Sequence, residues 1–414
     1  MRIVYLAQSY PPMVSGAAIF VRDIAEAMAA GGHRVLVIAA SDIGKPYITQ
    51  RGNLKVLRLK SFHNPMRVGQ RVLLYPRRAI LKALHDFAPD VIHAHEPLIS
   101  WVGVEYARRM SIPITFTMHM LPWFFSAFLP DVLNLRAMAE AAGWMYVRSM
   151  TRKFTSVITT TKITADAVTG MTGVQTKTIS CWINTQTFCP PLSSDPGTAA
   201  RTRLHLPLNV PVILHVGRLD PEKRVDRIVQ AAAHAMEQSD AHLLIVGDGR
   251  EKPALIKLSQ SLGIADRVHF PGFISVAEGL PEIYRMASLF VMASEVESQG
   301  IVLLEAAASG LPIAAVDATS ISETVHHRVN GYLTGPGDIQ ALGEAIADLL
   351  RSPEESRRMG AESRRLAEKF DIQHTRLQHE QFYGKLVEQN SRARKKNKLY
   401  ARWKRVKSWL GISE

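Results

Sequence analysis

The sequence has few cysteines and no long apolar run, and each absence excludes a class of protein. Only two cysteines, Cys181 and Cys189, occur in 414 residues. Two cysteines are too few for a disulfide framework and suit a reducing compartment. Neither has His or Cys close by in the sequence, so no structural metal is expected. No apolar run reaches the roughly eighteen residues of a spanning helix, so any membrane contact should be peripheral.

The composition also argues against a disordered or exported chain. It is 47% hydrophobic and 21% charged, and 414 residues are enough for two domains with buried cores. The N-terminus, MRIVYLA, lacks the longer apolar region and the cleavage site of a secretion signal, and it predicts a short strand instead. We therefore expect a cytoplasmic protein.

Acidic residues are scarce near the C-terminus. Residues 391–414 contain nine Lys and Arg and one acid, so they carry +8 of the net charge of +13. Within them, apolar residues recur at the spacing of one helical face: Leu399, Trp403, Val406 and Leu410. The sequence predicts a basic amphipathic tail from residue 386 to 414.

Three interpretations of this tail remain open. An interfacial helix would bind an anionic membrane, with each cation near the surface contributing about 1 kcal/mol. A solvated tail and a basic arm for nucleic acid are the alternatives. We favour the membrane, with Trp403, Lys404 and Arg405 as contact residues, and consider nucleic acid the least favoured.

Short apolar segments alternate with helical patterns along most of the chain, as in βαβ units. In the first half they are IVYLA, VLVIAA, VLRL, VIHAH, ITFTMH and SVITTT, and in the second half VILHVG, HLLIVG, VHF, LFVMA and IAAV. The region between them is rich in Pro and small polar residues, which is typical of a linker.

The predicted fold class is therefore α/β, with two doubly wound, Rossmann-like domains and a cleft between them. We place the N-terminal domain at residues 1–188, the linker at 189–211 and the C-terminal domain at 212–385. The segment 354–386 predicts two helices that could pack back across the cleft. Ligands of such sheets usually bind at the carboxyl ends of the strands, near helix N-termini.

A basic pair follows the first strand of the second domain. In VILHVGRLDPEKRVD, Arg218 and Lys223 lie at or near a strand-to-helix turn, where a guanidinium and an ammonium could hold one anion. Two ordinary surface charges are the alternative. The next strand ends in VGDG, where Gly247 and Gly249 would let a ligand or another backbone approach closely.

Two carboxylates flank a predicted helix start in ESQGIVLLEAAASGLP. The helix should begin near Gly300 and end at a Gly310 cap, which places Glu297 in the preceding loop and Glu305 on the second turn. The backbone N–H groups of residues 298–302 would face an anion. Glu305, inside an apolar run, needs a partner, either a ligand hydroxyl or a salt bridge within its own domain.

These motifs, in this order, resemble glycosyltransferase family 4, which contains retaining enzymes of the GT-B architecture. Two further segments contribute to the resemblance, AAASGLPIAA and ISETVHHRVNGYLTGPGD. The likeness covers roughly residues 1 to 385. It implies that Glu297 contacts hydroxyls of the donor sugar and Glu305 the ribose, while Arg218 and Lys223 hold the diphosphate.

The resemblance also implies roles for residues in both domains. His119, in TFTMHMLPW, matches a histidine near the transferred sugar, and Gly16 matches a glycine loop facing the diphosphate. Val246, Gly247 and Phe273 fall where the family contacts the nucleotide base. The helix start would contribute Ser298, Gln299, Gly300, Ile301 and Val302.

The activity that this resemblance implies is transfer with retained configuration, without a divalent metal and without a cofactor other than the nucleotide-sugar co-substrate. The sequence has Ser298-Gln299-Gly300 where many members have Gly-Phe-Gly. This version looks like that of diacylglycerol glucosyltransferases and of enzymes similar to phosphatidylinositol mannosyltransferases. We therefore expect UDP-glucose as donor, with GDP-mannose as second choice.

The acceptor should enter through the first domain, where MLPWFFSAFLPDVL concentrates aromatic residues. Trp123, Phe124 and Phe125 directly follow His119, so an apolar acceptor channel competes with an ordinary core. Basic residues also surround a helical pattern upstream, between Arg67 and Leu84. The hypothesis is a cytoplasmic enzyme on the inner face of the cell membrane that glycosylates a lipid such as diacylglycerol.

Two other functions share part of this evidence. A transferase for a polysaccharide or small soluble acceptor would use the same donor residues without depending on lipid. A non-catalytic protein that binds nucleotide sugars or nucleic acid would form no product with any acceptor.

Overall fold

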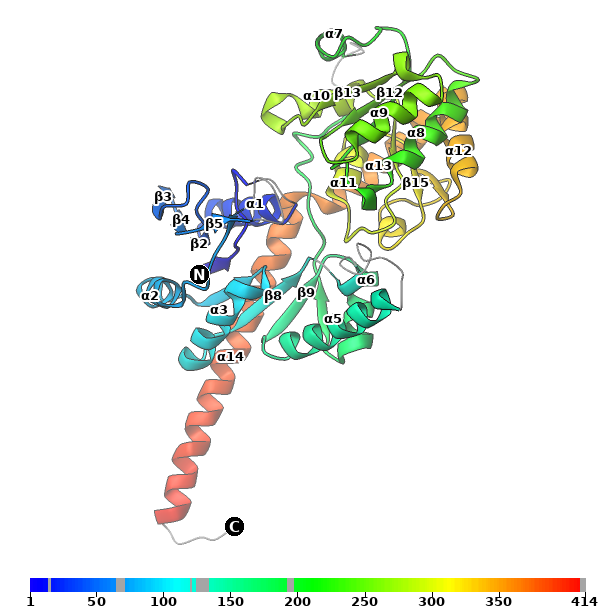
Figure 1. The fold of residues 1–414 in the computed structure, drawn as a ribbon. Helices are drawn as coiled ribbons and strands as arrows, with labels where there is room; N and C mark the ends of the chain where they lie inside the picture. Colours follow the sequence, from blue (N-terminus) through cyan, green and yellow to red (C-terminus); the bar gives the residue numbers. More distant parts are fainter. Residues whose placement is uncertain (14–15, 65–70, 120, 124–133, 192–196, 410–414) are drawn as a thin grey trace.

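The computed structural model shows two α/β domains and one long C-terminal helix (Figure 1). It describes residues 1–409 apart from 14–15, 65–70, 120, 124–133 and 192–196, and side chains as far as residue 393. Each domain has a sheet covered by helices on both faces, and the sheet is largely parallel in the first domain and parallel in the second. The predicted fold class is confirmed.

The N-terminal domain is built on an eight-stranded sheet in the described part of the chain, with strand order β10-β9-β8-β7-β1-β2-β4-β3. Every neighbouring pair is parallel except β3 with β4. The strands are β1 (Arg2–Leu6), β2 (Arg34–Ala40), β3 (Tyr47–Arg51), β4 (Leu54–Leu59), β7 (Val91–Ala94), β8 (Ile114–Met118), β9 (Ser156–Thr159) and β10 (Thr176–Thr178). A separate small ribbon pairs β5 (Phe62–His63) with β6 (Arg71–Val72). The helices are α1 (Gly16–Ala30), α2 (Arg77–Phe87), α3 (Pro97–Met110), α5 (Leu135–Thr151) and α6 (Lys162–Thr172).

The C-terminal domain has a six-stranded parallel sheet among the described residues, in the order β13-β12-β11-β14-β15-β16. Its strands are β11 (Val212–Val216), β12 (His242–Val246), β13 (Val268–Gly272), β14 (Leu289–Met292), β15 (Ile313–Val316) and β16 (Gly331–Thr334). Its helices are α8 (Val225–Met236), α9 (Lys252–Ser261), α10 (Leu280–Met286), α11 (Ile301–Ala308), α12 (Ile339–Arg351) and α13 (Pro353–Ala367).

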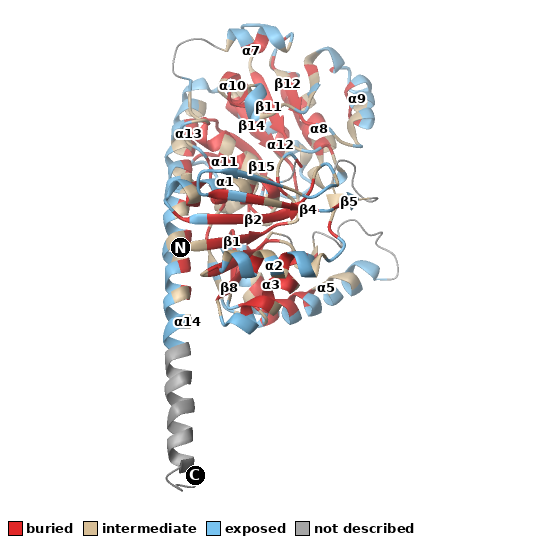
Figure 2. Cartoon of the chain, turned by 90° about the vertical axis from the view of Figure 1, so that its left-hand side faces the viewer, coloured by how far each residue is buried: buried red, intermediate tan, exposed pale blue. Residues whose placement is uncertain are grey.

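The central strands of both sheets are buried along nearly their whole length, as Figure 2 shows. Helices cover both faces of each sheet, so the strands are apolar runs rather than alternating ones. This explains which strands the sequence predicts. The strands that the sequence patterns did not indicate are short or partly exposed, and they are β3, β5, β6, β10 and β16.

The predicted linker is not a simple connection. It contains α7 (Thr198–Arg203), which packs near α10 of the C-terminal domain. Arg201 of α7 is buried and donates to the carbonyl oxygens of Pro207, Val210 and Met286. Three carbonyl partners compensate the buried guanidinium and attach this stretch to the second domain.

The final helix, α14 (Ile372–Trp409), crosses from the C-terminal to the N-terminal domain. Its Tyr383 is fully buried and hydrogen-bonds Tyr5 and His93 of the N-terminal sheet. The two helices predicted in residues 354–386 are therefore α13 and α14. Helix α13 stays on the second domain, and α14 packs on the first. Beyond this contact α14 continues past the body of the protein (Figure 1). Among the described residues, no helix is both long enough and apolar enough to cross a membrane.

Candidate active site

An ion pair between Lys223 and Glu297 lies at the carboxyl edge of the C-terminal sheet. Lys223 ends the single turn Pro221–Lys223 after β11, and Glu297 lies in the loop after β14. Because β11 and β14 are adjacent parallel strands, their exits share one edge. Lys223 Nζ contacts Glu297 Oε1, and the two side chains are 19% and 11% exposed. The fold thus brings together two residues that the sequence separates by 74 positions.

The loop carrying Glu297 is held in place by hydroxyl groups. The backbone N–H of Glu297 donates to Thr319 Oγ1 at 3.0 Å, and Ser320 Oγ donates to the Glu297 carbonyl at 3.0 Å. Ser294 Oγ donates to the carbonyl of Glu222, on the loop of Lys223, at 3.3 Å. These bonds fix the two charged groups relative to each other, and the sequence alone did not indicate Thr319.

Arg218 has different partners from those expected. Its guanidinium contacts Asp220 and lies 2.6 Å from Glu222, and the side chain is 60% exposed. Both carboxylates belong to its own loop. Arg218 therefore lies at the predicted edge but does not join the Lys223–Glu297 pair in this conformation.

The N-terminus of α11 faces the first domain. Gly300 has a φ of +72° and α11 starts at Ile301, close to the predicted start. A Cβ placed on Gly16, the first residue of α1, would lie 4.0 Å from Ile301 Cδ1. The predicted glycine and the predicted helix start are thus neighbours across the domain boundary, and the N–H groups near Ser298 and Val302 belong to this helix start.

Glu305 is half-buried and accepts a hydrogen bond from Tyr284. Tyr284 O–H donates to Glu305 Oε2 at 2.7 Å. Burial raises the pKa of Glu305 to about 7, although the Tyr284 bond lowers it. In the described part of the chain Glu305 has no cationic partner, so the salt bridge considered from the sequence is wrong there. Its partner is a hydroxyl, which leaves carboxylate oxygen for another donor.

The side chain of Gln299 connects the two domains. It is 2% exposed, and its Oε1 accepts a 2.6 Å hydrogen bond from the backbone N–H of Cys181. Nearby, Glu323 accepts from the N–H groups of Lys162 and Ile163 at the start of α6. The predicted helix-start residue is therefore also an interdomain contact, which its sequence position did not reveal.

His119 lies at the exit of β8, on the first domain's side of the site. Its Nε2 is 2.9 Å from Nδ1 of His95, and its ring makes an edge contact with Phe20 at 4.9 Å between centroids. Burial lowers the pKa of His119 to about 4. His119 is consequently a neutral imidazole around pH 7. In the sequence, VIHAH indicates only a strand, and nothing in it singles out His95.

A second residue that the sequence did not select is Glu96, next to His95. Its carboxylate accepts from the backbone N–H groups of Gln8 at 2.6 Å and Ser9 at 3.0 Å. Burial raises the pKa of Glu96 to about 7. Glu96 thus holds the loop that leads from β1 toward Gly16.

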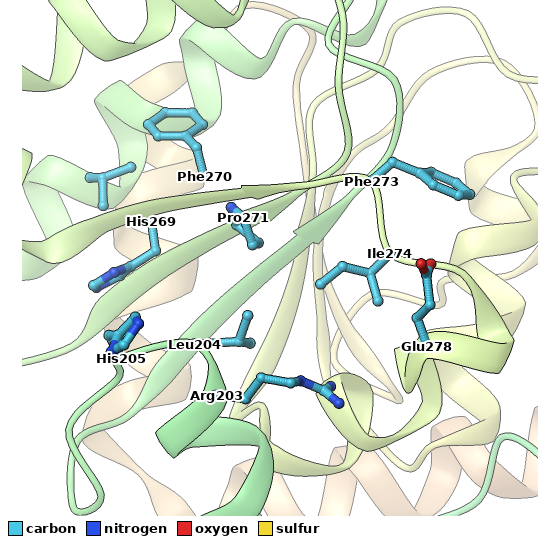
Figure 3. Close-up of a pocket in the computed structure, with 10 residues that line it drawn as sticks. Arg203, Leu204, His205, His269, Phe270, Pro271, Phe273, Ile274 and Glu278 are labelled. Carbon is cyan, nitrogen blue, oxygen red and sulfur yellow. The ribbon is translucent and has the colours of Figure 1, made fainter.

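The predicted base-contact residues lie around β12 and β13. The Val246 side chain is buried, and Gly247 has a φ of +141°. A Cβ at Gly247 would meet the Gly217 carbonyl oxygen at 1.8 Å, so another backbone already requires this glycine. Phe273 is 57% exposed at one end of a cavity of about 620 Å³ (Figure 3). The cavity follows the edge strand β13 and does not include the Lys223–Glu297 pair.

The predicted acceptor residues are only partly described. Trp123 is half-buried, and its ring lies 5.6 Å from that of Trp144 on α5. Phe124 and Phe125 fall outside the described residues. Trp403, Lys404 and Arg405 lie on α14, beyond the described side chains. Within the described residues no cluster of three or more His, Cys, Asp or Glu could hold a metal ion.

Known structures define the class of protein that has this arrangement. The sucrose-phosphate synthase of Thermosynechococcus elongatus has a TM-score of 0.79 to this chain and is 25% identical, covering 93% of this chain and 99% of its own. HepE of Anabaena, solved in complex with UDP, has a TM-score of 0.73 over 93% of this chain and all of its own, at 22% identity. The fold is that of the GT-B glycosyltransferases.

Family models match each half of the chain separately. Residues 14–187 match the model described as Glycosyltransferase Family 4, and residues 198–366 match the model described as Glycosyl transferases group 1. The chain therefore belongs to the glycosyltransferases, which transfer a sugar from a nucleotide sugar.

Curated relatives cover most of the chain. A GDP-mannose-dependent alpha-mannosyltransferase of Mycobacterium tuberculosis is 27% identical over 362 residues, which are 84% of this chain and 88% of the relative. This level of similarity supports the class of enzyme.

Proposed function

We propose that this glycosyltransferase is a retaining, metal-independent hexosyltransferase that transfers a hexose to a membrane lipid such as diacylglycerol. UDP-glucose is the favoured donor, and GDP-mannose, the donor named for one relative, is the second choice. The observation that carries the transfer proposal is the Lys223–Glu297 pair beside the N-terminus of α11. It supplies a cation for a diphosphate and a carboxylate for sugar hydroxyls at one sheet edge.

The proposed donor position uses residues of both domains. The diphosphate would lie between Lys223 and the α11 N–H groups, opposite Gly16, where the helix terminus favours negative charge. The ribose hydroxyls would donate to Glu305, and the base would lie near Gly247 and Phe273. Arg218 would exchange its exposed contacts with Asp220 and Glu222 for the diphosphate, at little cost because exposed ion pairs are weak.

The chemistry follows from where charge develops. The bond between the anomeric carbon and the diphosphate oxygen breaks, and a bond from the same carbon to the acceptor hydroxyl oxygen forms on the same face. Lys223 and the helix N–H groups stabilise the charge on the departing diphosphate. Glu297 and His119 orient the sugar through its hydroxyls. The acceptor's proton goes to an oxygen of the leaving diphosphate.

Two features support a lipid acceptor and an anionic membrane surface. The basic segment 391–414 follows the part of α14 that packs on the first domain. Helix α5 exposes Met138 and Met145, whose side chains are 64% and 68% exposed. Helix α5 lies at the end of the first domain that is remote from the second, and α14 projects past that end (Figures 1 and 2). This would place the enzyme peripherally on the inner face of the cell membrane.

The test is a screen of purified protein against nucleotide sugars, with and without mixed lipid vesicles, measuring release of nucleoside diphosphate and glycosylated product. We expect release with one donor and a lipid product when vesicles are present. Lys223→Ala is the control for the site and should abolish both. Absence of release with every donor and acceptor would refute the transfer proposal.

The second candidate is transfer to a soluble acceptor, favoured by the half-buried Trp123, which packs on Trp144 as a core residue would. The same screen separates the two candidates. Donor turnover that needs a soluble sugar acceptor and is indifferent to vesicles would support the second candidate and exclude the lipid.

A further inference from the structure

A buried histidine, His95, and a half-buried one, His119, join two strand exits of the first domain. His95 directly follows β7 and His119 directly follows β8, and β7 and β8 are adjacent parallel strands. His95 Nδ1 and His119 Nε2 are 2.9 Å apart, and the rings are stacked with 5.2 Å between centroids. The two histidines lie close together because the carboxyl ends of two adjacent parallel strands meet at the same edge of the sheet.

The His95 ring is fixed from several directions. It is 3% exposed, and its backbone N–H donates to the Leu6 carbonyl at 3.0 Å. The ring of His93 lies 4.2 Å away and that of Phe20 5.6 Å away, between centroids. His93 is itself held by Thr117 and by Tyr383 of α14, at 2.6 Å each. The ring that faces His119 therefore cannot turn without repacking this cluster.

Only one proton can occupy the bond between two neutral imidazoles. Burial lowers the pKa of both His95 and His119, so both rings are neutral around pH 7. His95 Nε2 is buried and meets no hydrogen-bond partner among the described residues. A buried N–H without an acceptor is rarer than a buried lone pair without a donor. The proton of His95 thus belongs on Nδ1, which donates to His119 Nε2.

This arrangement decides the tautomer of His119. With Nε2 accepting from His95, His119 carries its own proton on Nδ1. Within the described part of the chain Nδ1 makes no hydrogen bond. It is available to donate to an oxygen of a ligand.

We propose that His95 is a positioning residue for the transfer reaction: it fixes the ring orientation and the Nδ1–H tautomer of His119, so that His119 donates a hydrogen bond to a hydroxyl oxygen of the transferred sugar. This inference rests on the proposed function, because it uses the contact between His119 and the sugar. His95 acts only through His119.

The test compares His95→Asn, His95→Leu and His119→Ala with the full-length protein. The amide of Asn can replace Nδ1 of the imidazole, whereas Leu fills the space without a polar atom. We expect His95→Leu to lower kcat for donor turnover 10- to 100-fold, which is about 1.4 to 2.7 kcal/mol. His95→Asn should recover most of this loss. Affinity for the nucleoside diphosphate alone should stay within twofold, because His119 is proposed to contact the transferred sugar and not the nucleotide or its diphosphate.

A matched control exists in the second domain. His242 on β12 pairs with His269 on β13 through Nδ1 and Nε2 at 2.8 Å, away from the Lys223–Glu297 pair. His242→Leu removes a similar histidine pair and should leave kcat unchanged. Equal losses in His242→Leu and His95→Leu would mean that general destabilisation, and not positioning, causes the effect.

Nitrogen NMR of the imidazole rings gives a readout that is independent of turnover. His119 should show a protonated Nδ1 in the wild type and in His95→Asn, and a mixture of tautomers in His95→Leu. A protonated Nε2 in the wild type, or normal kcat in His95→Leu, would overturn the inference. If the wild type shows the expected tautomer but His119→Ala turns over normally, the role that the proposed function gives His119 is refuted instead.

Discussion

Tyr284 donates a hydrogen bond to Glu305 inside the second domain, and this bond only partly offsets the burial of the carboxyl. The pKa of Glu305 is raised to about 7. A raised carboxyl pKa means that the folded protein prefers the protonated form. The contribution of the Glu305 carboxyl to the free energy of unfolding is therefore present at acidic pH, and it is lost as the pH rises from about 4.5 through about 7.

Donor binding should have the opposite pH dependence. A ribose hydroxyl donates to the ionised carboxylate, so the affinity for the nucleotide sugar should rise about tenfold between pH 6 and pH 8 if only the ionised form binds. The pKa of His119 is about 4, so it does not titrate in this range. Calorimetric titration at several pH values would measure the effect.

Two variants test the assignment of this pH dependence. Glu305→Gln should remove most of it and leave only a contribution from Glu96, whose pKa is also about 7. Tyr284→Phe should move the midpoint to higher pH because a bond that stabilises the carboxylate is lost. An unchanged pH profile in Glu305→Gln would show that another group is responsible.

The Lys223–Glu297 pair should behave as one unit in turnover. Lys223→Ala and Glu297→Ala should each lower kcat at least about 100-fold while the protein stays folded, because charge stabilisation at the reacting atoms is lost. The double variant should be little worse than either single one, since interacting residues are not additive. Lys257→Ala, an exposed position on α9, is the control and should retain activity. Losses that multiply in the double variant would contradict a shared role.

Gln299 should prove to be a stability residue rather than a specificity residue. Gln299→Ala leaves the buried N–H of Cys181 without its acceptor, which should cost about 1 to 3 kcal/mol and lower the melting temperature. The exposed Gln260→Ala is the matched control and should not change it. We expect the preferred acceptor to be the same in both variants. A switch of acceptor in Gln299→Ala would instead support the link to lipid substrates that the sequence suggested.

Removal of residues 391–414 should separate membrane binding from folding. Among the described side chains of α14, the last buried one is Leu386, and Asn390 donates to the Ser111 carbonyl oxygen. The truncated protein should therefore keep its melting temperature and its donor hydrolysis. The full-length protein should bind anionic vesicles at low salt and dissociate from them as the salt concentration rises. Each cation contributes only about 1 kcal/mol to binding, and salt screens this attraction. Equal vesicle binding by the truncated protein would refute the role of the tail.

The two-domain α/β fold could be predicted because its strands are short apolar runs between helical patterns. Val212–Val216 and Leu289–Met292 are buried on both faces of a parallel sheet, so nearly every residue is apolar. The sequence does not predict strand β3, YITQR, because four of its five residues are exposed at a sheet edge. Its pairing with β4 depends on tertiary contacts and not on its own composition.

The sequence by itself determined where the donor site should be sought. Local patterns place Glu297 before a helix, Glu305 within it and Lys223 after a strand, and the sheet edge follows from the order of elements. Tertiary structure alone decided the partners: Lys223 with Glu297, Tyr284 with Glu305, Gln299 with Cys181 and His95 with His119. The physical reason is that hydrogen bonds act over about 3 Å, and residues far apart in sequence reach that distance only when whole sheets and domains have packed.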